Sequence, residues 1–166
     1  SEYNKILNLK RLPDNFSKQI SISLVSILIN EENYEEALDL IRHSSKNRNR
    51  TDPDWAILKA RVLYFQNDFQ GALQNLNQFL NANQTDKYNV NLPNDLLLLA
   101  YRCHFELKQY TDAVKYLTLL IATEPKTNYL KELANLHGLQ KEPIKQLAIT
   151  EILYDQNKIS EENQLI

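Results

Sequence analysis

A short pattern that recurs four times along the chain constrains the fold more than any other feature of the sequence. Each copy begins with an aromatic residue or proline, continues with two mostly polar residues, and in the first three copies ends with a small residue and an aliphatic one. The first residues of the copies are Tyr34, Phe69, Tyr110 and Pro143, at intervals of 35, 41 and 33 residues (69 − 34, 110 − 69 and 143 − 110). The fourth copy is the weakest, because Gln146 stands where the others have alanine. A period of this length indicates stacked pairs of helices that bury apolar faces against neighbouring pairs.

Composition and apolar spacing both favour helices over strands. The 166 residues include only 2 Gly and 5 Pro, so tight hairpin turns are scarce. Trp55, Leu58, Val62 and Phe65 recur at intervals of three and four, as they would along one side of a helix. We therefore predict an all-α fold with helices at about 14–30, 33–46, 53–66, 69–82, 93–107, 110–123, 127–139 and 142–156.

These helices pair into four repeats within one predicted domain that covers residues 1–166. The repeats span about 14–46, 53–82, 93–123 and 127–156, and residues 157–166 are expected to begin a further helix. The segment 82–93 is rich in Asn and predicts an extended loop, which explains the long second interval. Because the sequence starts at Ser1 and contains no Met, we expect it to be a fragment of a longer chain, or a chain from which a leader has been removed.

The small residue of the pattern predicts a close approach between the two helices of a pair. Ala37, Ala72 and Ala113 each lie three positions after the aromatic residue, and therefore on the same side of the helix. A larger side chain at this position would push the paired helices apart.

With these features, residues 20–156 resemble the tetratricopeptide repeat family. The resemblance rests on the strings at 33–38, 68–73 and 109–114, and it departs from the family pattern at the tryptophan position of most units. It implies a right-handed α-solenoid of about four helix-turn-helix repeats. It also implies a concave groove, lined by the first helix of each repeat, that binds a protein or peptide partner.

The resemblance further implies which residues line that groove, and these are Arg61, Tyr64, Leu97, Tyr101, His104, Lys131 and Asn135. Side chains of these types can pair with the backbone of an extended peptide or with a carboxylate. The alternative is that they are only solvated. The carboxylate clamp of chaperone-binding relatives needs Lys and Asn where this chain has Ile22 and Ser26, so chaperone C-termini are not expected ligands.

A narrower resemblance rests on the C-terminal half, on the strings at 104–113, 129–137, 145–154 and 158–163. These strings are similar to repeat proteins encoded beside TonB/ExbB-type energy-transduction genes of gammaproteobacteria. The chain departs from that group at Leu130-Lys131, where the group has Trp-Leu. The resemblance implies a periplasmic partner of a TonB-type transport system, and a cytoplasmic location is the alternative.

The sequence offers little that would support catalysis or cofactor binding. The net charge of −2 and the pI near 5.9 argue against a nucleic-acid partner, and no apolar run is long enough to span a membrane. The three histidines and the single Cys103 lack the spacing of a metal site, and two glycines cannot form a phosphate loop. We therefore expect no catalytic residues, no cofactor, no metal and no enzymatic activity.

Two classes of function remain open at this stage. The first is a scaffold for a protein complex. The second is a module that binds a small ligand or associates with peptidoglycan, or a regulatory subunit of an enzyme complex. Self-association is a third reading, because an uncapped end of a helical repeat exposes apolar surface.

Overall fold

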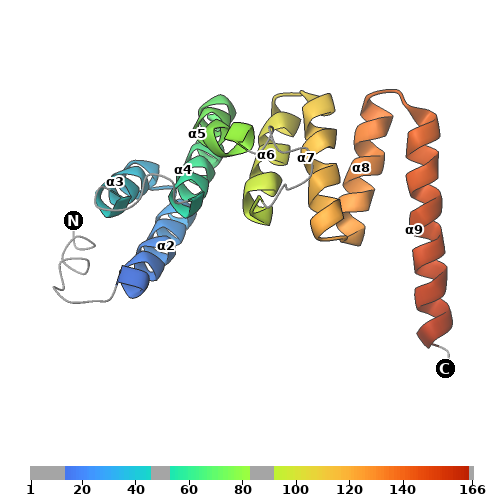
Figure 1. The fold of residues 1–166 in the computed structure, drawn as a ribbon, viewed down its shortest axis with the longest axis horizontal. Coiled ribbons are helices and arrows are strands. Elements are labelled where there is room, and N and C mark those ends of the chain that lie inside the picture. The colour runs from blue at the N-terminus through green and yellow to red at the C-terminus, as the bar shows by residue number, and fades with distance from the viewer. Residues whose placement is uncertain (1–13, 46–52, 83–91, 165–166) are drawn as a thin grey trace. The chain divides into compact units, whose positions relative to one another are not determined.

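The computed structural model describes residues 14–45, 53–82 and 92–164, and these ranges form eight α-helices and no strand (Figure 1). The helices are α2 (Asp14–Asn30), α3 (Tyr34–Ser45), α4 (Pro53–Phe65), α5 (Phe69–Ala82), α6 (Asn94–Glu106), α7 (Tyr110–Thr123), α8 (Thr127–Leu139) and α9 (Pro143–Gln164). The predicted all-α fold of paired helices is confirmed. Except at the C-terminal end of α9, the predicted bounds differ from the observed ones by no more than one residue.

The last helix is longer than the sequence pattern predicted. Residues 157–164 continue α9 without a break, so the prediction that 157–166 begin a further helix was wrong. No glycine or proline follows Pro143, and the Glu, Lys and Gln residues of this stretch favour a continuous helix. The predicted loop at 82–93 lies mostly outside the described residues.

The chain divides into two compact units, Ser1–Val90 and Asn91–Ile166, and each contains two helix pairs. We call the first helix of each pair the A helix (α2, α4, α6 and α8) and the second the B helix (α3, α5, α7 and α9). Within each unit, the two helices of a pair pack together, and the B helix of the first pair also packs on the A helix of the second.

The core of the first unit lies among α2, α3 and α4, and α5 packs on α4 (Figure 1). The side-chain amide of Asn75 on α5 donates to the backbone carbonyl of Ala56 on α4 at 2.6 Å. Apolar side chains from three helices make up this core, namely Val25, Leu28, Ile29, Ala37, Leu40, Ile41, Trp55, Leu58 and Val62.

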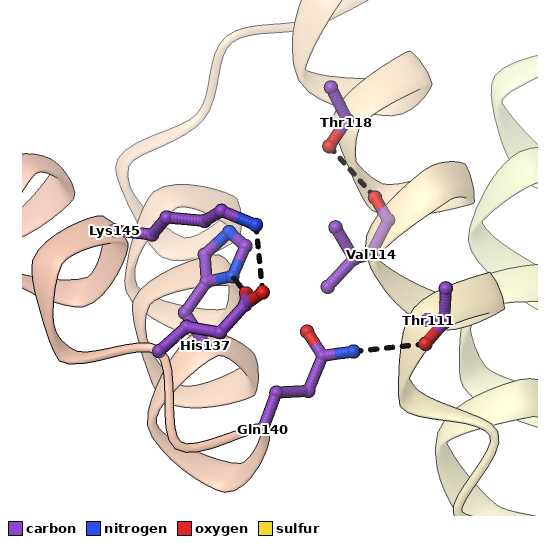
Figure 2. A network of polar contacts seen from close by, with 7 residues as sticks. Thr111, Val114, Thr118, His137, Gln140 and Lys145 are labelled. Carbon is purple, nitrogen blue, oxygen red and sulfur yellow. Dashed lines mark hydrogen bonds and ion pairs between the residues drawn. The ribbon is translucent and has the colours of Figure 1, made fainter.

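In the second unit, α7 packs on both A helices. Its Thr123 hydroxyl donates to the side-chain oxygen of Asn94 at the start of α6, at 2.9 Å. Gln140, just after α8, donates from its amide to the Thr111 hydroxyl of α7 at 3.1 Å (Figure 2). The fully buried side chains include Leu96, Leu97, Cys103, Leu117, Leu120 and Leu136.

The four turns inside the helix pairs share one backbone geometry. Their left-handed residues are Glu32, Asn67, Lys108 and Lys141, with φ of 58°, 62°, 59° and 59°. In each turn the next N–H donates to a carbonyl five residues earlier, as Glu142 does to His137 at 2.9 Å. This Schellman arrangement satisfies carbonyls at the end of the A helix. The left-handed residues recur at the same 35, 41 and 33 intervals as the sequence pattern, so they fix the register of the repeats.

The small residues of the pattern are buried in three pairs, and the fourth pair differs. Ala37, Ala72 and Ala113 have no exposed surface. In the last pair Gln146 takes the equivalent place, and the small residue is instead Gly138 on the facing helix. A β-carbon at Gly138 would lie 3.0 Å from the side-chain nitrogen of Gln146. Gly138 therefore leaves room for the end of the Gln146 side chain.

Candidate partner-binding face

The common turn geometry identifies equivalent positions on the four A helices. Counting six residues back from each left-handed residue gives one polar side chain in each pair, namely Ser26, Arg61, Arg102 and Asn135. We call these four the A-face residues. Ser26 and Arg61 are half-buried, whereas Arg102 and Asn135 are exposed. Arg61, Arg102 and Asn135 can donate hydrogen bonds, and the two arginines carry a positive charge. The Ser26 hydroxyl donates to the backbone carbonyl of Ile22 at 3.0 Å.

On α6 the structure moves the predicted groove positions by one residue. By the register of the turns, the α6 equivalent of Arg61 and Asn135 is Arg102, whereas Tyr101 is the residue that the resemblance implied for the groove on this helix. One residue along a helix is a rotation of about 100°. Tyr101 is 6% exposed and Leu97 is 0% exposed, so both side chains contribute to the core of this helix instead of an open face.

The prediction was off by one residue because the faces of α6 differ little in polarity. Four consecutive leucines at 96–99 give no polar position from which to read the rotation of the helix, and the long second interval precludes direct counting from α4. Arg102 was therefore missed. Arg102 is located by its separation of six residues from Lys108 along the sequence, and this count can be made only once the turn geometry is known.

His104, the third predicted residue on α6, is held by the turn that follows it. Its Nδ1 lies 2.7 Å from Oε1 of Gln109, and its ring stacks on Tyr116 with centroids 5.3 Å apart. His137 makes the equivalent contact in the last pair, with Nδ1 2.7 Å from Oε2 of Glu142. The two histidines thus occupy the same position in successive repeats and connect each A helix to the start of its B helix.

The aromatic residue Tyr64 is also engaged at a turn. Its ring lies 5.3 Å from that of Phe69 across the turn and 5.7 Å from that of Phe65. Phe105 occupies the equivalent position on α6 and contacts Tyr110 in the same way, at 6.1 Å. These half-buried rings help to join the two helices of a pair.

The remaining predicted residues, Arg61, Lys131 and Asn135, keep their assigned places on the A helices. Lys131 and Asn135 are exposed and lie one turn apart on α8, so both can reach a common partner. Whether any of these residues contacts a partner stays a prediction. In the second unit, Arg102, Lys131 and Asn135 form the polar part of the candidate face, and Arg61 holds the equivalent position in the first unit.

The groups with shifted pKa values lie in the packing and at the turns instead of on this face. Burial, and to a smaller extent the Glu106 carboxylate, raises the pKa of the Cys103 thiol to about 12. Burial, followed by Asp112, also raises the pKa of the Tyr116 hydroxyl. A thiol with a raised pKa stays protonated at neutral pH, which disfavours a role as a nucleophile. Within the described residues, no group of three potential metal ligands comes together.

The last turn holds a small network of charged and polar groups (Figure 2). Glu142 accepts a hydrogen bond from the Lys145 ammonium at 2.8 Å through one oxygen and contacts His137 through the other. The hydrogen bond from Lys145, and then that from His137, lowers the pKa of the Glu142 carboxyl. This network fixes the start of α9 relative to α8.

Across the described ranges, no helix has the length and apolar character needed to cross a bilayer.

Comparisons with known proteins support the fold and leave the function open. No family model and no curated protein matches the chain. Among solved structures, the chain is similar to MamA 41-end from Desulfovibrio magneticus RS-1, with a TM-score of 0.65 and 13% sequence identity. The similarity covers 94% of this chain and 93% of that chain. At this identity it shows the fold alone, a helical repeat of the tetratricopeptide type.

Proposed function

We propose that this chain is a non-enzymatic interaction module whose A helices bind a protein or an extended peptide. The observation that carries the proposal is the shared position of the A-face residues, six residues before each left-handed turn residue. The A helices also carry much of the core, but their residues Arg102 and Asn135 remain exposed. The tetratricopeptide-type fold supports this reading, because stacked helix pairs present extended binding surfaces.

The chemistry of the A-face residues indicates what they would recognise. Arginine and asparagine donate hydrogen bonds, and arginine can bind a carboxylate with two parallel bonds. Lys131 adds a further cation one turn before Asn135. An extended peptide that presents backbone carbonyls and a carboxylate, at a side chain or at its C-terminus, therefore fits this face best.

The proposal is tested with a library of random peptides displayed with either free or amidated C-termini. We expect the wild-type chain to select carboxylate-bearing peptides and R102E to bind them about tenfold more weakly, because a charge-assisted hydrogen bond becomes a repulsion. K115E is the matched control, since Lys115 is exposed on the B helix of the same pair. Failure of the wild-type chain to select any peptide, or an equal loss in R102E and K115E, would overturn the proposal.

A finer assignment, in which the partner belongs to a periplasmic TonB-type transport system, rests on the resemblance of the C-terminal half alone. It proposes a periplasmic location and TonB/ExbB-type components as partners. Purification of the chain from its source organism, with TonB-type and ExbB-type subunits measured by quantitative mass spectrometry, tests it. These subunits should be recovered with the wild-type chain and depleted with R102E. Equal recovery with both would remove the assignment.

A further inference from the structure

One side of α8 carries three exposed side chains of different chemistry, four residues apart from one to the next. They are Lys131, Asn135 and Leu139, and Leu139 is 45% exposed. Residues four apart form a ridge along a helix, so these side chains lie in a row about 12 Å long. We call these three residues the α8 row. A cation stands at one end of the row, an amide in the middle and an apolar side chain at the other end.

The positive charge of the α8 row is free to pair with a partner. Within the ranges that the structure describes, Lys131 forms no ion pair. Glu132 follows it in sequence and is also exposed, but successive residues of a helix point about 100° apart. The α8 row itself therefore contains one cation and no acid, and its charge is complementary to an acidic side chain.

The equivalent side of α6 stays open although another helix pair follows it. By the register of the turns, Arg102 and Glu106 correspond to Asn135 and Leu139, and both are exposed. The next A helix, α8, packs on α7. The openness of this side is therefore a property of the A helices and does not depend on whether a further pair follows.

The period of an extended peptide matches the spacing of the α8 row. Four residues of a helix advance about 6 Å, and two residues of an extended chain advance about 6.6 Å. Every second side chain of an extended chain points to the same side. A peptide that runs along α8 can therefore place its residues i, i+2 and i+4 against Lys131, Asn135 and Leu139.

We propose that the α8 row binds an extended peptide segment that carries an acidic side chain and, four residues away, a large apolar side chain. The acidic side chain pairs with Lys131, and the apolar one packs on Leu139. The carboxylate belongs to a side chain instead of a chain end, because a row of exposed residues lets the peptide continue in both directions. This inference rests on the proposed function, to which it adds the sequence preference of the partner.

Peptides with one Glu and one Leu, separated by two to six positions in either order, test the spacing. The other residues are polar and uncharged, and the C-terminus is amidated. We expect separation by four to bind about tenfold more tightly than separation by three or five, because an odd separation points the two side chains to opposite sides. Equal binding at three, four and five would overturn the proposal. Tighter binding of a peptide whose only carboxylate is its C-terminus would also overturn it.

Two substitutions link this preference to the α8 row. K131Q should remove the advantage of Glu over Gln in the peptide, and L139N should remove the advantage of Leu over Ser. I152N is the matched control, since Ile152 is 49% exposed but lies on the B helix α9. Circular dichroism verifies that the variants keep their helices. Persistence of both preferences in K131Q and L139N would contradict the proposal.

The same measurements separate this inference from the proposed function. If R102E weakens peptide binding but the separation of Glu and Leu has no effect, the proposed function stands and the α8 row is not the contact. A wild-type chain that binds no peptide removes both. Self-association of the wild-type chain that L139N abolishes, seen by sedimentation velocity, would show that a second copy occupies the row, and would overturn the inference.

Discussion

At the four turns, residues with side chains occupy a conformation that glycine adopts more readily. Lys108 and Lys141 have φ of 59°, in the left-handed region. That conformation costs a non-glycine residue about 1–2 kcal/mol. The cost is tolerated because the Schellman hydrogen bonds and the packing of the paired helices determine the backbone there. At these residues, the surrounding packing and hydrogen bonds therefore keep the backbone in a conformation that the residue type alone disfavours.

Replacing Lys108 with glycine should stabilise the second unit. The relief of the left-handed conformation outweighs the greater freedom of glycine in the unfolded chain, so we expect a gain of about 0.5–1 kcal/mol. The rate at which a thiol reagent reaches Cys103, the only cysteine and fully buried, reports opening of this unit. The control K115G makes the same change inside α7 and should cost about 1 kcal/mol. Faster labelling in both variants would show that the turn is not strained.

The Glu142 network predicts a pH dependence at the last turn. In the folded chain, hydrogen bonds lower the pKa of the Glu142 carboxyl from its ordinary value of 4.5. The bond from Lys145 has the larger effect, followed by that from His137. The stabilisation is therefore fully present above pH 4.5 and is lost as the pH falls through the lowered folded pKa. The difference in urea midpoint between wild type and E142Q should shrink over that acidic range. A constant difference, or the same profile for the exposed control E132Q, would contradict this assignment.

At the scale of elements, a fully buried alanine lies near the start of the B helix in each of the first three pairs. Ala113 is fully buried where α7 meets α6, and the last pair has Gly138 beside the Gln146 side chain. The burial of the three alanines agrees with the role that the sequence pattern assigned to the small residue, and the close approach itself stays a prediction.

Enlarging this residue should separate the helices. A113L is expected to lower the free energy of unfolding by about 1–3 kcal/mol, because the added carbons overpack the crossing. Ala122 is exposed on the same helix, so A122L provides the matched control and should change stability little. Urea unfolding followed by circular dichroism compares the two. An equal effect of both substitutions would show that the α6–α7 crossing can accommodate a leucine side chain without overpacking.

For the whole molecule, the sequence predicted the helices well and the rotation of one helix poorly. Seven helices were placed to within a residue because apolar spacing and the recurring turn pattern are local signals. The rotation of α6 could not be predicted, since the leucine run at 96–99 has no polar side. Tyr101 was therefore assigned to the position that Arg102 occupies. The contacts of His104 and Tyr64 across the turns likewise depend on tertiary geometry.

The proposed function places partner binding on the A helices. It is tested most directly by nuclear magnetic resonance of the side-chain N–H groups while a selected peptide is added. We expect the guanidinium signal of Arg102 and the amide signal of Asn135 to shift. The amide signal of Asn75, which bonds to Ala56 at the α4–α5 crossing, should stay in place. Shifts confined to residues of the B helices, with Arg102 and Asn135 unchanged, would contradict the account.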